Sequence, residues 1–447
     1  MKRMKDNSGE LPRKMKIKQT MNEIGRSAKA ALTYVQAIPT AKGQTMMGVP
    51  FKKRDVVRFG FVGVGGRGFG QMETILTVEG VQVTAISDPV EATVLRAKER
   101  VEKAGQPSPT IEADWRKLCA RDDVDFVYIC SPWHAHVDQA VHAMECGKDT
   151  GVEVPVAGTL ADCWRLVDTS EQTRQHCVIL ENCCYGDSEL TVLTMVRAGL
   201  FGTITHGEAA YIHDLRKILL ADTGEGVWRR EPHKTRNGNF YPTHGLGPVA
   251  WYMNIHHGDR FARLVSMSSQ QAALSEYRDA NLPADSPTRK ETYRCGDMNS
   301  SLIRTALGRT ILLQHDVVTP RPYTRLNLIA GSKGAFSDYP PRIFLDGQTE
   351  HEWKPLDKLK AQYEHKFWKE SGELALKNGG HGGMDFIMNH RLVQTIRQGL
   401  PPDMNVYDAA AWSAPGPLSE ISVAWDGLSL PFPDFTRGHW QDAGAPA

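Results

Sequence analysis

A glycine-rich turn at residues 63–68 constrains the fold of this chain more than any other feature of its sequence. The turn reads Gly63-x-Gly65-x-x-Gly68 and follows an apolar, β-rich run at 57–62. The residues after it have helical spacing, so the turn is predicted to join a buried strand to a helix. Glycines at these positions allow a tight turn and a close approach of backbone N–H groups to a pyrophosphate. The sequence therefore predicts a dinucleotide-binding α/β unit.

An acidic residue supports this prediction and indicates the cofactor. Asp88 stands twenty residues after Gly68, at the end of a predicted strand at 81–87. A carboxylate at that place accepts hydrogen bonds from the adenine ribose and repels a 2′-phosphate, which favours NAD over NADP. The alternative is a glycine turn and a loop aspartate that bind no ligand.

The hydrophobic pattern divides the rest of the chain into two kinds of structure. From 56 to 182, predicted strands alternate with predicted helices, which is typical of an α/β Rossmann domain with a parallel sheet. After about residue 200 the period becomes two, which predicts an α+β domain with an open, mostly antiparallel sheet. The expected division is a basic N-terminal extension at 1–55, an NAD-binding domain at 56–182, and a substrate-binding domain with C-terminal helices at 183–447. The expected strands are 57–63, 81–87, 125–130, 151–154, 177–181, 203–213, 262–267, 300–305, 310–318 and 325–329, and the expected helices are 69–78, 90–104, 136–146, 160–174, 383–398 and 406–412.

Charge and cysteine content exclude several classes of partner. The 447 residues carry 53 Lys and Arg against 52 Asp and Glu, so no overall basic field exists for nucleic acid. We expect no membrane span, and the lack of a clear signal peptide favours a cytoplasmic location. The eight cysteines form no C-x-x-C pair and are expected to be reduced core residues.

The turn after the third expected strand places polar side chains near the predicted cofactor. It reads Ser131-Pro132-Trp133-His134-Ala135-His136, at the sheet edge where a doubly wound fold presents its nicotinamide site. Two histidines at this spacing resemble metal ligands, yet no third ligand is suggested nearby, so no metal is expected. His136 is instead interpreted as a helix-starting residue beside the cofactor.

These motifs, together with residues 146–155, resemble the glucose-fructose oxidoreductase/inositol dehydrogenase/MocA superfamily. The resemblance covers about residues 56–440 and implies a Rossmann domain followed by an open-sheet domain. Dehydrogenases of this superfamily carry Glu-Lys-Pro where this chain has Glu153-Val154-Pro155. Their lysine helps to deprotonate the substrate hydroxyl, and a valine cannot replace it.

Further motifs resemble glycoside hydrolase family 109, known for NAD-dependent α-N-acetylgalactosaminidase activity. They are Trp228-Arg229-Arg230, the block 237–248 with Tyr241-Pro242-Thr243-His244-Gly245, the segment 320–325, and His381-Gly382-Gly383-Met384-Asp385. One departure is the turn Trp133-His134-Ala135-His136, where the family leads us to expect Trp-Glu-Trp-His. With the glycine loop, the resemblance implies NAD contacts from Gly63, Gly65, Gly66, Arg67, Gly68, Asp88, Trp133, His134, His136, Glu153, Val154 and Asn182. It implies sugar contacts from Tyr211, Arg229, Tyr241, Thr243, His244 and Tyr323.

The implied residues suit an unusual route to hydrolysis. Ordinary glycosidases use two carboxyl groups, whereas the implied pocket offers Tyr, His and Arg, with Glu153 the only clear carboxylate. NAD-dependent glycosidases instead oxidise carbon 3 of the sugar, eliminate the aglycone after loss of the carbon 2 proton, add water and reduce the product again. The predicted catalytic residues are Tyr185 for the carbon 2 proton, His244 for the sugar or the leaving oxygen, and Glu153.

Alternatives remain for these residues and for the protein as a whole. Tyr185 fits a core or rim tyrosine, His244 a helix cap, and Arg229 a solvated pair with Arg230. The whole chain also fits an NAD-dependent sugar or inositol dehydrogenase, or a non-catalytic NAD-sensing protein. The expected partner is a small-molecule glycoside or a glycan terminus. A homo-oligomer is expected by analogy with open sheets that pair, and the family analogy leaves export open.

Overall fold

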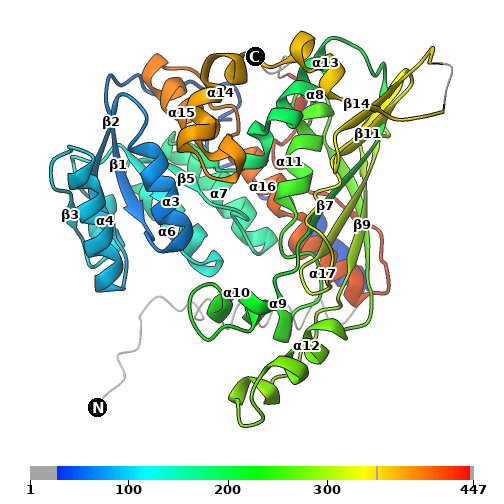
Figure 1. Cartoon of the computed structure of the whole chain (residues 1–447), viewed down its shortest axis with the longest axis horizontal. Helices are drawn as coiled ribbons and strands as arrows, with labels where there is room; N and C mark the ends of the chain where they lie inside the picture. The colour runs from blue at the N-terminus through cyan, green and yellow to red at the C-terminus, as the bar shows by residue number, and fades with distance from the viewer. Residues whose placement is uncertain (1–27, 349–350, 443–447) are drawn as a thin grey trace.

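The first sheet of the protein is parallel and has six strands. The computed structural model describes residues 28–348 and 351–442 and is drawn in Figure 1. The strand order is β3-β2-β1-β4-β5-β6, so the chain runs outward from β1 in both directions, as in a Rossmann fold. The strands are β1 (Val57–Val62), β2 (Val81–Ser87), β3 (Thr110–Ile111), β4 (Phe126–Ile129), β5 (Asp149–Val152) and β6 (Cys177–Ile179).

Helices cover this sheet because its central strands are apolar on both sides. All four residues of β4 are buried, as are all but one of β1. A strand buried on both faces needs covering layers, which the connecting helices provide. These helices are α3 (Gly66–Ile75), α4 (Glu91–Lys103), α5 (Trp115–Cys119), α6 (Trp133–Glu145) and α7 (Leu160–Thr173).

The second sheet is mostly antiparallel and lies at the right of Figure 1. Its order is β14-β13-β12-β11-β7-β10-β9-β8-β15, and only β7 and β10 pair in parallel. Burial alternates along β9, where Ile303 is buried and its neighbour Leu302 is exposed, so one face of the strand packs on the core. The strands are β7 (Ile204–Ile212), β8 (Phe261–Ser268), β9 (Asn299–Thr305), β10 (Thr310–Asp316), β11 (Leu328–Gly331), β12 (Gly334–Ser337), β13 (Arg342–Leu345), β14 (Lys354–Pro355) and β15 (Leu430–Pro431).

The inner face of the second sheet carries helices, and the late helices return to the first sheet. Helix α11 packs on β7, and α17 packs on β8. Helix α15 packs on α3 and β1, and α16 packs on α7 and β6. The remaining helices are α8 (Asp187–Arg197), α9 (Arg216–Leu219), α10 (Gly226–Thr235), α11 (Thr243–Tyr252), α12 (Ala273–Asn281), α13 (Asp357–Tyr363), α14 (Lys366–Asn378), α15 (Met384–Gln398), α16 (Val406–Ser413) and α17 (Pro415–Ala424), with short 3₁₀ turns η1 (Asn182–Tyr185), η2 (Pro287–Lys290), η3 (His381–Gly383) and η4 (His439–Gln441).

The fold class predicted from sequence is therefore confirmed, with a few shifted boundaries. Strand β2 has the predicted limits, whereas α6 begins at Trp133, three residues before the expected start, directly after Pro132. Strand β11 begins later than expected because Leu326 and Asn327 both have positive φ, which interrupts the extended backbone. The division into 56–182 and 183–447 stays a prediction.

The described part of the N-terminal extension packs against the rest of the chain. Helix α2 (Ala28–Gln36) contacts β15, and Ala31, Val35, Met46 and Phe51 are buried. The basic residues of the predicted N-terminal extension fall largely at 1–27, outside the described residues. All eight cysteines are described and free. Within 28–348 and 351–442, no helix has both the length and the apolar character needed to cross a membrane.

Candidate active site

The glycine loop leaves open space at the N-terminus of α3. Gly63 has a φ of +83°, and a Cβ on it would lie 2.8 Å from the Cys130 carbonyl carbon. A Cβ on Gly68 would lie 1.9 Å from the Gly63 oxygen, so both positions need glycine for packing. Around Gly65 and Gly66 a Cβ would meet nothing within 4 Å, and no side chain caps the helix. Two glycines that close the turn and two that leave its mouth open fit the pyrophosphate of NAD.

Asp88 lies beside this loop, as the ribose interpretation requires. Its Oδ2 accepts a hydrogen bond from the Val64 N–H at 3.0 Å, and its Oδ1 accepts from the Val90 N–H at 3.0 Å. The residue is half-buried, and a carboxylate can accept about four hydrogen bonds. Asp88 therefore fixes the loop and keeps acceptor capacity for a ribose.

The Arg67 side chain is turned away from a phosphate role. Its Nε donates to Glu153 Oε1 at 2.7 Å, while its two terminal nitrogens donate to Asp385 at 2.8 and 3.0 Å. The expected NAD contact of Arg67 is thus limited to its backbone in the first turn of α3, and its guanidinium joins the Rossmann sheet to α15. Burial raises the pKa of Glu153, and Arg67 opposes that rise.

Asp385 is a site residue whose role sequence reasoning missed. It lies in the first turn of α15 and also accepts from Asn182 Nδ2 at 2.8 Å. Burial alone would raise the pKa of its carboxyl group, but His381 and Arg67 hold it well below the usual range. Its sequence signal was its place at the end of the family-like motif His381-Gly382-Gly383-Met384-Asp385, which gave the residue no role. Asp385 therefore links two predicted NAD residues, Arg67 and Asn182, from the far end of the chain.

The side chains of residues 133–136 lie in different surroundings. The Trp133 ring packs against Trp228 at 4.9 Å, and its Nε1 donates to the Val154 carbonyl at 3.1 Å. His134 is exposed. The ring nitrogens of His136 lie 3.0 Å from the Pro155 oxygen and 2.7 Å from the Ser131 oxygen.

The expected cofactor contact of His136 stays a prediction. Burial lowers its pKa to about 4, so the imidazole is neutral near pH 7. A neutral ring donates from one nitrogen alone, so the His136 side chain makes one hydrogen bond, to the Ser131 or the Pro155 carbonyl.

The predicted sugar residues gather into one aromatic group. Tyr211 stacks on Tyr241 with ring centroids 4.4 Å apart, and its ring lies 6.3 Å from that of Tyr323. The Arg229 guanidinium lies 5.4 Å from the Tyr241 ring centroid and pairs with Glu225 at 2.8 Å. Trp133 joins the same group at 5.7 Å from Tyr241. The segments 211, 229, 241–244 and 323, distant in sequence, thus form a single group of rings beside the Arg229 guanidinium.

His244 connects this group to a buried carboxylate. Its Nε2 lies 3.3 Å from the Tyr241 hydroxyl, and its Nδ1 lies 2.7 Å from Glu181 Oε1. Glu181 follows β6 and is fully buried, as is Thr243. Sequence reasoning missed Glu181; its only signal was an acidic residue directly after a buried strand. The hydrogen bonds make His244 part of a Tyr–His–Glu chain instead of a helix cap.

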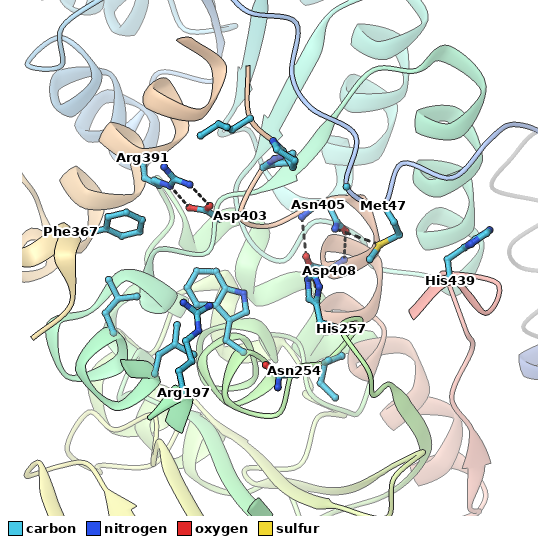
Figure 2. A pocket seen from close by; sticks show the side chains of 18 of the residues that line it. Met47, Arg197, Asn254, His257, Phe367, Arg391, Asp403, Asn405, Asp408 and His439 are labelled. Carbon is cyan, nitrogen blue, oxygen red and sulfur yellow. Dashed lines mark hydrogen bonds and ion pairs between the residues drawn. The ribbon is translucent and has the colours of Figure 1, made fainter. Parts of the chain in front are cut away.

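The Tyr185 side chain contacts Asp403 and Trp251, and its catalytic role stays a prediction. Its hydroxyl donates to Asp403 Oδ2 at 3.2 Å, and its ring packs on Trp251 at 5.5 Å. Asp403 and Trp251 line a separate cavity of about 540 Å³, where Figure 2 shows Asp403 paired with Arg391. Burial raises the pKa of the Tyr185 phenol well above its usual value. The sequence placed its backbone at the sheet edge, but the turn η1 directs its side chain toward α15 and Asp403.

One group of described residues brings three metal-ligand atoms together. The ligand atoms of Glu181, Cys183 and His244 lie within 4.8 Å of one another. Burial raises the pKa of the Cys183 thiol well above its usual value. The Glu181–His244 hydrogen bond already uses two of these three residues.

Two sequence families match consecutive parts of the chain. An oxidoreductase family with an NAD-binding Rossmann fold matches residues 57–181, and the glycosyl hydrolase 109 C-terminal domain matches residues 185–442. A glycosyl hydrolase family 109 protein of Solibacter usitatus is 55% identical over 404 residues, which cover 89% of this chain and 92% of that protein. One of Streptomyces filamentosus is 47% identical over 431 residues, covering 94% and 86%.

Solved structures share the fold at low identity. A levoglucosan dehydrogenase in complex with NADH and levoglucosan aligns with a TM-score of 0.66 and 16% identity, over 85% of this chain and 100% of that one. The scyllo-inositol dehydrogenase of Lactobacillus casei aligns with a TM-score of 0.60 and 14% identity, over 84% and 99%. At such identities the likeness shows the two-sheet architecture alone.

Proposed function

The chain belongs to glycosyl hydrolase family 109, and we propose that it releases terminal α-linked N-acetylgalactosamine through transient oxidation of the sugar at carbon 3. Its family membership and its NAD-binding domain make the protein an NAD-dependent glycoside hydrolase. The sugar, the anomer and the route are our proposal.

The observation that carries the proposal is the chemistry of the aromatic group. Its proton-transferring members are Tyr241 and His244, a phenol and an imidazole 3.3 Å apart. Three neighbouring carboxylates are engaged: Glu181 with His244, Glu153 with Arg67, and Glu225 with Arg229. A retaining or inverting mechanism needs two carboxyl groups facing the glycosidic bond. Phenol and imidazole suit proton transfer at an activated carbon instead.

In the proposed reaction the cofactor accepts and returns hydrogen, and the chain binds the cofactor and the sugar. NAD, when bound, supplies a reversible acceptor for the hydrogen on carbon 3, which makes the carbon 2 proton acidic and leaves no net oxidation. The glycine loop and Asp88 are placed to hold it. Asp385 and Asn182 support Arg67 and Glu153 beside that loop. Residues of the second sheet and α11 then handle the sugar.

We assign the carbon 2 proton to Tyr241 and His244 in place of Tyr185. Burial raises the pKa of Tyr241 well above its usual value, which Arg229 opposes, so the phenol needs an adjacent base to give up its proton. His244 is that base. Arg229 is placed to bind the N-acetyl carbonyl or a sugar hydroxyl, and Tyr211 and Tyr323 form walls for the ring.

Val154 argues against net alcohol oxidation. It stands where the related dehydrogenases carry a lysine, it is 3% exposed, and its carbonyl accepts from Trp133. A buried valine neither accepts nor donates the hydroxyl proton, so a dehydrogenase reaction lacks its usual base here.

A paired assay tests the proposal. The protein, supplied with NAD, is offered 4-nitrophenyl α- and β-N-acetylhexosaminides while nitrophenol and NADH are followed together. We expect nitrophenol from the α-galactosaminide with no accumulation of NADH. Accumulation of NADH with free sugars would instead support a sugar dehydrogenase, and NAD binding without turnover of any glycoside or sugar would support a sensing protein.

A further inference from the structure

Glu181 is a buried carboxylate with a fixed orientation. It follows β6 and precedes η1, where its Oε1 accepts from the Cys183 N–H at 3.0 Å. Its side chain is 0% exposed. This hydrogen bond within the turn fixes the Glu181 carboxylate, which can therefore orient a side chain that it contacts.

The carboxyl group is ionised. Burial alone would raise the pKa of Glu181, but His244 and the Cys183 N–H hold it below its usual value. A buried anion is stable only beside such donors. Glu181 therefore places a negative charge against the imidazole of His244.

This charge determines which nitrogen of His244 carries the proton. An ionised carboxylate only accepts hydrogen bonds, so Nδ1, which lies 2.7 Å from Oε1, must be the protonated nitrogen. In the neutral ring Nε2 is then an acceptor, and it faces the Tyr241 hydroxyl at 3.3 Å. Tyr241 thus donates to His244, and the phenol oxygen stays directed toward the aromatic group.

We propose that Glu181 is a positioning residue that fixes the tautomer of His244, so that Tyr241 passes its proton to Nε2 as its oxygen takes the carbon 2 proton. The inference rests on the proposed function. The C–H electron pair becomes the double bond between carbons 1 and 2, and the bond from carbon 1 to the aglycone breaks. The departing oxygen takes a proton back from the imidazolium through Tyr241. Glu181 stabilises the imidazolium in between.

The first arm of the test observes the tautomer and needs no substrate. Protein labelled with ¹⁵N-histidine is studied by NMR, and the His244 signals are assigned by their loss in His244→Gln. We expect a protonated Nδ1 in the wild type and a changed tautomer ratio in Glu181→Gln. A wild-type His244 with its proton on Nε2 would overturn the inference, whether or not the protein hydrolyses glycosides.

The second arm measures turnover in a double-mutant cycle. Glu181→Gln should lower kcat about 100-fold with KM and NAD content nearly unchanged, and Glu181→Asp should recover part of the loss. Because Glu181 acts through His244 on Tyr241, Glu181→Gln with Tyr241→Phe should be no slower than Tyr241→Phe alone. If the two substitutions lower kcat multiplicatively, or if Glu181→Gln loses its bound NAD, the role of Glu181 is merely structural.

A second buried histidine–carboxylate pair, His256 with Asp408, provides a control variant. Asp408→Asn removes the carboxylate of another buried histidine pair and should keep kcat at a permissive temperature. If the wild type hydrolyses no hexosaminide, the proposed function fails, while the tautomer measurement still decides the placement of His244.

Discussion

Two buried histidine–carboxylate pairs in this protein have the same contact and different surroundings. His244 meets Glu181 through Nδ1 at 2.7 Å, and His256 meets Asp408 through Nδ1 at 2.9 Å. The imidazole of His256 is 4% exposed and that of His244 is 14% exposed. The contact itself therefore does not distinguish a structural pair from a reactive one.

The remaining atoms of each pair make the difference. Asp408 Oδ2 accepts from the Asn405 N–H at 2.9 Å and completes the capping box of α16. His244 instead presents Nε2 to the Tyr241 hydroxyl in the aromatic group. One pair fixes a helix start, and the other polarises a phenol.

Substitution of each histidine by glutamine should give the largest difference in kcat between the two pairs. His244→Gln should lower kcat about 1000-fold, because the proton acceptor beside Tyr241 is lost, with NAD content unchanged. His256→Gln should lower the melting temperature and keep kcat near the wild-type value. Steady-state kinetics and thermal unfolding of both variants measure this, and equal losses of kcat would erase the contrast.

A third buried carboxylate, Asp385, extends the comparison to a guanidinium partner. Asp385→Asn should lower the free energy of unfolding by about 3 kcal/mol, because Arg67 loses a bidentate charged partner. The folded-state pKa of Asp385 is held below its unfolded value. Its stabilisation is thus fully present above about pH 4 and is lost as pH falls through the folded value.

Denaturant titrations at several pH values check this prediction. The difference between wild type and Asp385→Asn should shrink as the pH falls below about 4, because the wild-type carboxyl group then becomes protonated. A difference that grows in that acidic range would contradict the assigned charge of Asp385.

Asp408→Asn should have a moderate effect on stability alone. The loss of a charged hydrogen bond to His256 and of the helix cap should cost about 1–3 kcal/mol in the free energy of unfolding. Chemical denaturation measures the cost, and kcat below the unfolding transition is the control. A large fall in kcat would place this pair in the reaction as well.

Tyr185→Phe should have the smallest effect. Its hydroxyl donates to Asp403, which Arg391 also binds, so the carboxylate keeps a partner in the variant. We expect kcat within about twofold of the wild type and a loss of about 1 kcal/mol of stability at most. A strong loss of turnover would restore Tyr185 as the base.

The sequence predicted features that depend on neighbouring residues. The glycine loop, β2 and Asp88 lie within one short segment, and their spacing alone places them together. Glu181 and Asp385 escaped prediction because their partners His244 and Arg67 lie 63 and 318 positions away. The side-chain contacts of His136 and Tyr185 escaped prediction for another reason. Both residues follow strands of the first sheet, but the direction of a side chain depends on tertiary neighbours that periodicity does not reveal.

Deuterium incorporation from heavy water reports whether the carbon 2 proton of the sugar is removed during hydrolysis. The protein hydrolyses an α-N-acetylgalactosaminide in heavy water, and the released sugar is analysed by NMR and mass spectrometry. If Tyr241 and His244 remove the carbon 2 proton, that proton exchanges with solvent and the product carries deuterium at carbon 2. A product with hydrogen retained at carbon 2 would mean direct displacement and would contradict the account.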